Sequence, residues 1–188
     1  MQWLAYRYWR LKGWTFHGEI PDIPKMIAIG APHTTNWDFV LYLAALHHYR
    51  IKVTYIGKHT LFRWPFGWFF RMFGGIPVDR SKPGGIVGEV ARAFDAADTM
   101  ILVMAPEGTR SNAPHWKSGF VNIAESADVP VVVASVDFAR KQLTIGPTIV
   151  YKGDAENFMD RVRDFYANKQ GLYPEKQGPI RLAEEAHL

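Results

Sequence analysis

The chain has 188 residues, 48% of them hydrophobic, and a formal net charge of +4, which predicts one folded globular domain and argues against a disordered chain. It contains no cysteine, so disulfides, thiolate metal sites and a cysteine nucleophile are excluded, in keeping with a reducing cytoplasm. No secretory signal pattern is evident, and no apolar run approaches the roughly 20 residues that cross a bilayer.

The first half of the chain predicts two strands, two helices and an aromatic segment. Residues 2–12 place aromatic and aliphatic side chains between basic ones, a pattern typical of a short amphipathic helix. Residues 25–31 are expected to form a buried strand, residues 37–49 have helical spacing, and residues 52–56 alternate like a strand. Residues 59–73 are rich in aromatic side chains and are expected to be helical but interrupted, because they contain proline and glycine.

The second half continues the alternation of strands and helices. Residues 76–78 are expected to be a short extended piece, and residues 86–97 have the spacing of a helix. An apolar strand is predicted at 100–104, a short helix at 118–127 and another apolar strand at 129–136.

A last strand, at residues 143–151, is followed by an amphipathic helix with Phe158 and Val162 on its apolar side. Residues 172–188, rich in proline, glycine and charge, are expected to form a loose tail. Apolar strands separated by helices predict an α/β fold: a single domain over residues 1–188, with a mostly parallel sheet flanked by helices on both faces. No internal repeat or domain linker is evident.

The ends of two predicted strands carry residues suited to chemistry. In sheets of this kind, ligands bind outside the carboxyl ends of the strands. His33 follows the strand at 25–31, and Glu107 follows the strand at 100–104. We therefore expect both residues at the same edge of the sheet.

His33 and Asp38, with four residues between them, are the candidate catalytic pair. Residues five apart lie roughly 140° from each other on a continuous helix, so the two meet only if His33 precedes the helix and Asp38 lies in its first turn. Asp38 would then orient a histidine that acts as base towards a substrate hydroxyl. The alternative is structural: Thr35 with Asp38 resembles an N-terminal capping pair, and for this hexapeptide taken alone capping is the commoner explanation.

Arginine and lysine side chains offer sites for an anionic group. Arg80 follows a Gly-Gly bend and a short strand, and its planar guanidinium suits bidentate phosphate binding. Taken alone, a surface arginine paired with Asp79 is the commoner arrangement. Lys58 and Lys117 are further candidates for anion binding, although each taken alone is more often a solvated side chain.

The sequence Glu107, Gly108, Thr109, Arg110 follows the apolar strand at 100–104. Gly108 allows a tight turn or a close approach to a ligand. Thr109 and Arg110 offer a hydroxyl and a guanidinium to an oxyanion. A solvated turn is an equally open interpretation of these four residues alone.

The composition also indicates contact with a membrane surface. Residues 50–82 carry seven Lys and Arg against one acid, and seven of the thirteen residues 61–73 are aromatic. Aromatic and basic side chains together are typical of segments at the interface of an anionic leaflet. We expect a protein held peripherally on the inner face of the cell membrane, with a candidate interfacial helix within residues 1–20. A nucleic-acid partner is not expected, because no continuous basic stripe is present, and the histidines show no metal-ligand spacing.

Four blocks, in this order, resemble the glycerophospholipid acyltransferases, the family typified by 1-acyl-sn-glycerol-3-phosphate acyltransferase. The resemblance lies in a motif-bearing core at residues 25–136. The blocks are His-x4-Asp, Gly-x-Ile-x-Val-x-Arg, Glu-Gly-Thr-Arg-Ser and a Val-Pro block, at residues 33–38, 74–80, 107–111 and 129–132.

This resemblance implies a glycerol-3-phosphate acyltransferase-like fold and an acyl transfer from acyl-CoA or acyl-acyl-carrier-protein to a lysophospholipid hydroxyl in phospholipid biosynthesis. No cofactor is implied beyond the acyl thioester, which is a co-substrate. His33 would be the general base and Asp38 its orienting partner. Arg80 would hold the acceptor phosphate, with Lys58 as a candidate oxyanion donor, and Pro130 would shape the sheet edge beside the acyl chain. The motif residues Glu107, Gly108, Thr109 and Arg110 would complete the acceptor site.

Two other functions remain open from the sequence. One is a non-catalytic lipid-binding module at the membrane surface. The other is a lipid or thioester hydrolase in which His33 activates water instead of an acceptor hydroxyl.

Overall fold

The computed structural model describes residues 1–64, 67–72, 74–78 and 85–187. Its described strands form one sheet in the order β1-β7-β6-β2-β5-β3-β4. Five strands, from β6 to β4 across the sheet, are parallel to one another. The strands are β1 (Thr15–His17), β2 (Lys25–Ala31), β3 (Thr54–Lys58), β4 (Gly75–Val78), β5 (Met100–Met104), β6 (Val131–Asp137) and β7 (Gln142–Ile149).

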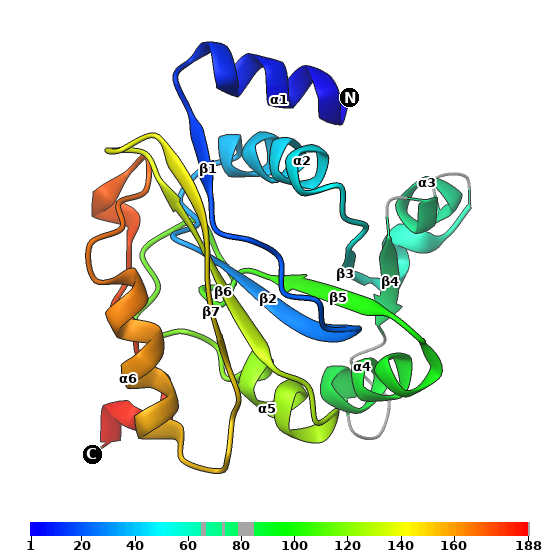
Figure 1. Cartoon of the computed structure of the whole chain (residues 1–188). Coiled ribbons are helices and arrows are strands. Elements are labelled where there is room, and N and C mark those ends of the chain that lie inside the picture. Colours follow the sequence, from blue (N-terminus) through cyan, green and yellow to red (C-terminus); the bar gives the residue numbers. More distant parts are fainter. Residues whose placement is uncertain (65–66, 73, 79–84, 188) are drawn as a thin grey trace.

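Helices cover both faces of this sheet (Figure 1). The helices α1 and α2 lie on one face, α4, α5 and α6 lie on the other, and α3 lies beside the edge strand β4. The α-helices are α1 (Gln2–Leu11), α2 (Trp37–Tyr49), α3 (Gly67–Met72), α4 (Gly85–Ala96), α5 (Gly119–Ser126) and α6 (Ala155–Tyr166). Three 3-10 turns are η1 (His59–Phe62), η2 (Pro174–Lys176) and η3 (Glu184–His187).

This architecture confirms the predicted α/β fold with a mostly parallel sheet. The exception is β7, which runs antiparallel to β6 because only four residues connect the two strands, too few for the crossover that a parallel pair requires. The strand β1, which pairs with β7, was not predicted, since three residues are too few to show an alternating pattern.

Two apolar clusters hold the layers together. The larger one joins the central strands to α4, α5 and α6, with Ile27, Leu102 and Val131 fully buried. The smaller one joins α1 to α2 through Trp9, Leu41 and neighbouring side chains. Both faces of the central strands are therefore covered, which explains why these strands are apolar throughout.

One predicted segment is confirmed and one differs. Residues 59–73 divide into the turn η1 and the helix α3, in agreement with the predicted interrupted helix, with Pro65 outside the described residues. The expected loose tail is packed against the domain: Leu182 is buried and forms a bridge with Trp116. Its polar composition hid this, because the segment is held largely by hydrogen bonds between polar side chains and distant backbone groups, which composition does not reveal. No helix in the described part of the chain has the length and apolarity needed to span a bilayer.

The register of the sheet brings two motif loops to one edge. Ile29 of β2 pairs with Met104 of β5, so Pro32 and Glu107, each three residues further along, leave the sheet at the same level. The strand β3 lies on the other side of β5 and also ends at this edge.

Packing of α2 between α1 and the sheet gives a test of this arrangement. Leu41 is fully buried, whereas Leu11 on α1 is 82% exposed. We expect Leu41→Ala to lower the free energy of unfolding by about 2–5 kcal/mol, because it leaves a cavity. The same truncation at the exposed position, Leu11→Ala, should change the free energy of unfolding by less than about 0.5 kcal/mol. Urea denaturation measures both, and equal effects would contradict the described packing.

Candidate active site

Asp38 holds the loop that precedes α2. Its Oδ2 atom accepts hydrogen bonds from the backbone N–H groups of Thr34 (2.9 Å) and Thr35 (3.0 Å). The same oxygen lies 3.1 Å from His33 Nδ1. Of the two alternatives that the sequence left open, orientation of the histidine is therefore confirmed. The carboxylate also binds the two N–H groups that precede Asn36, the N-cap of α2, which itself has no side-chain capping bond.

This geometry determines which nitrogen of His33 can act as a base. A carboxylate only accepts hydrogen bonds, so the neutral imidazole carries its proton on Nδ1 and leaves a lone pair on Nε2. The His33 side chain is 24% exposed and that of Asp38 is 6% exposed. The imidazole thus reaches solvent while the carboxylate stays buried.

Glu107 fixes the backbone of the same histidine. Its Oε2 atom accepts a hydrogen bond of 2.7 Å from the His33 N–H, and the residue is only 5% exposed. Burial raises the pKa of this carboxyl, and the hydrogen bond from His33 opposes that shift. In the structure Glu107 fixes the backbone of His33, a contact between residues 74 apart that no local pattern in the sequence could reveal.

The residues after Glu107 form an exposed turn. Gly108 has φ +65° and a Cβ atom there would lie 2.7 Å from Lys117 Cε, so glycine suits both the conformation and the space. The Lys117 N–H donates to the Pro106 carbonyl at 2.9 Å, which ties Lys117 to this turn. Thr109 and Arg110 are exposed, so the turn presents a hydroxyl and a cation to solvent.

The remaining predicted site residues are placed differently. Lys58 ends β3 at the same edge of the sheet, but its side chain lies outside the described part. Arg80 lies outside the described residues. Pro130 directly precedes β6, at the opposite end of the parallel strands from His33, and its carbonyl accepts from the Ile27 N–H at 2.9 Å. The structure therefore does not bring Pro130 together with the histidine.

A family model described as Acyltransferase matches residues 15–137, more than half of the chain. The chain belongs to the acyltransferase family. The matched region contains His33, Asp38 and Glu107, and it ends at the carboxyl end of β6.

Two individual acyltransferases are similar to this chain. One is the 1-acyl-sn-glycerol-3-phosphate acyltransferase of Streptococcus pneumoniae (strain ATCC BAA-255 / R6), 29% identical over 114 residues that make up 61% of this chain. The chain spans 42% of the length of that relative. The other is the crystal structure of the 1-acyl-sn-glycerophosphate (LPA) acyltransferase PlsC from Thermotoga maritima. It superimposes with a TM-score of 0.58 at 20% identity, covering 87% of this chain and 73% of that one, which confirms the acyltransferase fold.

No motif in the sequence identified the groups that lie behind His33 and Asp38. A cavity of about 40 Å³ lies between the two motif loops and the C-terminal segment, and its lining includes Pro32, Glu107, Trp116 and Gln177. The C-terminal residues carry no motif, so only their position identifies them. Among the described residues, no group of three His, Asp or Glu side chains is arranged to hold a metal ion.

The buried Glu107 predicts a specific dependence of stability on pH. Since its pKa is raised, the folded protein binds this proton more tightly than the unfolded chain, and stability falls as pH rises above the usual glutamate value. Glu107→Gln keeps an oxygen acceptor but does not titrate. We therefore expect the wild type to lose stability relative to Glu107→Gln between about pH 4 and about pH 7. The difference in the free energy of unfolding, variant minus wild type, should increase over this range. Chemical denaturation across this range, with the exposed Glu125→Gln as a charge-matched control, measures it; a flat difference would contradict the raised pKa.

Proposed function

We propose that this protein is an O-acyltransferase that moves a fatty acyl group from an acyl thioester to the hydroxyl of a lysophospholipid such as 1-acyl-glycerol-3-phosphate. The observation that carries the proposal is the contact of Asp38 with His33 Nδ1, because it leaves Nε2 available as a base. Membership in the acyltransferase family and the activities named for the two similar proteins support the same reaction.

The reaction follows from these positions. His33 Nε2 takes the proton of the acceptor hydroxyl while the oxygen attacks the thioester carbonyl. The Asp38 carboxylate stabilises the imidazolium that forms. The tetrahedral intermediate then collapses, the carbon–sulfur bond breaks, and the imidazolium returns the proton to the thiolate. No covalent bond to the protein is needed, which suits a chain without cysteine.

The acceptor phosphate would be held by cations at the same edge. Arg110 lies on the exposed turn that follows Glu107, and Lys117 lies against Gly108. Arg80 and Lys58 are the other proposed contacts, to the phosphate and to the oxyanion respectively. The donor would be acyl-CoA or acyl-acyl-carrier-protein.

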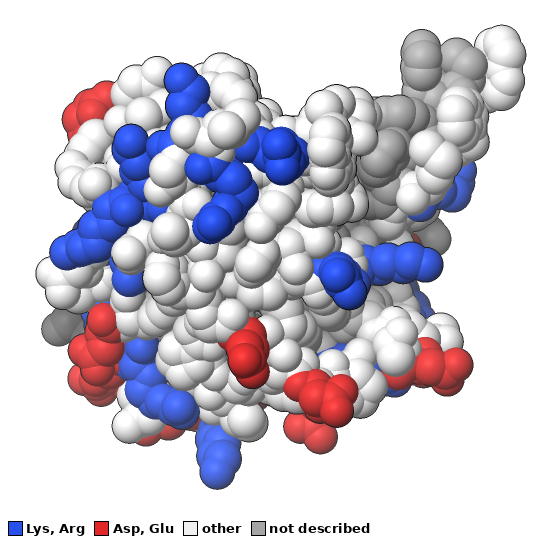
Figure 2. Space-filling model, turned by 45° about the horizontal axis from the view of Figure 1, so that its top comes forward, with Lys and Arg blue, Asp and Glu red and all other residues white. Residues whose placement is uncertain are grey.

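The face that carries α1 would rest on an anionic membrane surface. Trp3, Leu4 and Leu11 of α1 are 56%, 62% and 82% exposed. Figure 2 shows Lys and Arg gathered on this side of the molecule, and the described basic residues there include Arg7 and Arg10. Apolar and basic side chains on one exposed face suit the interface of an anionic leaflet.

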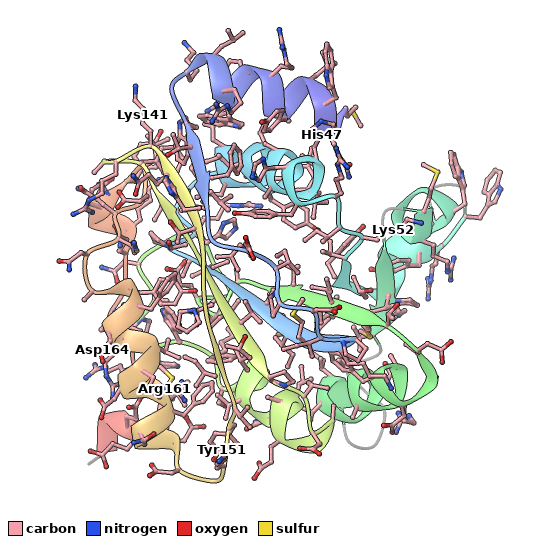
Figure 3. The ribbon with its side chains drawn as sticks, viewed as in Figure 1. His47, Lys52, Lys141, Tyr151, Arg161 and Asp164 are labelled. Carbon is pink, nitrogen blue, oxygen red and sulfur yellow. The ribbon has the colours of Figure 1, made fainter. Side chains whose placement is uncertain are left out.

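This face is continuous with the proposed site. The Tyr8 ring of α1 stacks on the Trp37 ring at 6.1 Å between centroids, and Trp37 adjoins Asp38. On the inner side, α1 packs on α2 through Tyr6 and His47, whose ring centroids are 5.2 Å apart. Lys141 lies at the turn between β6 and β7, near the end of α1 (Figure 3). A lysolipid in the membrane surface would thus have a short path to His33.

Thiol release from palmitoyl-CoA, with and without lysophosphatidic acid, tests the acyl transfer. We expect acceptor-dependent release by the wild type and a loss of about 10²–10⁴-fold in His33→Ala, the usual contribution of a general base. His17→Ala, an exposed histidine on β1, is the matched control and should retain activity. Release without acceptor would indicate a hydrolase, and equal activity of wild type and His33→Ala would sink the catalytic assignment.

Co-sedimentation with phosphatidylglycerol vesicles tests the membrane face. We expect the combined variant Trp3→Ala, Leu4→Ala and Leu11→Ala to bind at least about tenfold more weakly, because these side chains would be buried in the interface. Val150→Ala, half-exposed at the far end of the sheet, serves as the control. Binding that is undiminished in the triple variant would rule out α1 as the contact.

A further inference from the structure

The chain that follows α6 turns back and runs beside that helix towards the C-terminus (Figure 1). It lies outside the residues matched by the family model, yet it contacts both motif loops. We propose that residues 171–182, here called the C-terminal strap, position the His33 loop against the Glu107 loop, with Gln177 and Gly178 as positioning residues. This inference rests on the acyl transfer proposed above.

One end of the strap contacts the residue next to the base. Thr34 Oγ1 accepts a hydrogen bond of 3.3 Å from the Tyr173 N–H. A Cβ atom on Gly171 would lie 2.7 Å from Thr34 Oγ1, so the strap backbone lies directly against this side chain. Thr34 is 1% exposed, and its own N–H donates to Asp38 Oδ2. The strap thus adjoins the hydrogen bonds that orient His33.

The other end contacts the segment that follows the Glu107 turn. The Trp116 N–H donates to the Arg181 carbonyl at 2.7 Å, and Trp116 forms a parallel bridge with Leu182. A Cβ atom on Gly178 would lie 1.9 Å from the Ala113 carbonyl oxygen, a distance that real side chains do not adopt. The strap therefore fits this loop only with glycine at position 178.

Internal bonds make the strap a single unit. Gln177 Oε1 accepts from the Gly171 N–H at 2.8 Å, and Gln177 Nε2 donates to the Lys169 carbonyl at 3.2 Å. Arg163 of α6 donates to the Ile180 carbonyl at 3.4 Å and pairs with Glu185 at 2.7 Å. The strap is consequently tied to α6 at Ile180 and to Lys169, which follows the helix.

The helix α6 is in turn fixed to the sheet beneath the site. The buried Tyr166 hydroxyl lies 3.0 Å from the Ile29 carbonyl of β2 and 2.9 Å from the Ala134 carbonyl of β6. The cavity of about 40 Å³ that Gln177 and Gly178 help to line, beside Glu107, has room for only a few water molecules. A shift of the strap would therefore reach both Thr34 and the Glu107 loop, and a base displaced by about 1 Å loses roughly 100-fold in rate.

Two strap variants and one control test this inference. Gly178→Ala introduces the Cβ that meets Ala113, and Gln177→Ala removes two hydrogen bonds without adding an atom. We expect each to lower kcat for acyl transfer by about 10- to 100-fold, with KM for the thioester changed less than about twofold. Gly119→Ala is the control, because a Cβ there meets open space, and it should leave kcat unchanged. Gln177→Glu, which keeps the acceptor for Gly171, should recover part of the loss.

A second readout does not depend on turnover. The NMR signal of the His33 Nδ1 proton, which is held against Asp38, should be broadened or lost in Gln177→Ala and preserved in Gly119→Ala. Circular dichroism at the assay temperature gives the folded fraction of each variant. If Gly178→Ala does not fold, Gln177→Ala still decides the question.

The outcomes separate the two proposals. A wild type that transfers no acyl group to any lysophospholipid would overturn the proposed function, while the Nδ1 signal would still test the strap. Wild-type kcat and an unchanged Nδ1 signal in the folded Gln177→Ala variant would overturn the strap. A fall in kcat that only matches the unfolded fraction would also overturn it, because the segment would then serve stability alone.

Discussion

The site depends on one buried carboxylate oxygen, Asp38 Oδ2. It accepts hydrogen bonds from the backbone N–H groups of Thr34 and Thr35 and lies 3.1 Å from His33 Nδ1. Burying a carboxylate costs free energy unless hydrogen bonds compensate the loss of water, and here two of those bonds come from the loop that carries His33. The start of α2, the shape of the loop and the orientation of the imidazole are therefore set together.

Glu107 adds a second constraint from a different strand. Because parallel pairing places the ends of β2 and β5 side by side, its carboxylate reaches the His33 N–H at 2.7 Å. His33 is held by its ring on one side and by its backbone on the other. Such fixing from two elements is what a catalytic group requires, because its reaction allows only a narrow range of positions.

Much of this arrangement was predictable from residues close together in the sequence. The apolar runs at β2, β5 and β6 indicated buried parallel strands, since both faces of such strands are covered. The spacing of His33 and Asp38 indicated that they meet only across a helix start, as they do. The strand β7 was predicted at residues 143–151, but its antiparallel direction was not part of the prediction. The edge strand β1 and the packed C-terminal segment were not predicted, because a three-residue strand and contacts with distant residues leave no local pattern of side chains.

The sequence by itself determined the fold class, because periodicity reveals buried strands and helices, and it indicated the pair formed by His33 and Asp38, because these residues are close together in the chain. The family followed from the resemblance of four short blocks in their order along the chain. The tertiary structure decided what surrounds the pair: that Glu107 holds the histidine backbone, that Pro130 lies at the far end of the strands, and that residues 171–182 contact both loops. The hydrogen bond of Glu107 joins residues 74 apart, and the bond between the strap and Thr34 joins residues 139 apart. Only the register of the sheet and the return of the chain beside α6 bring such distant residues together.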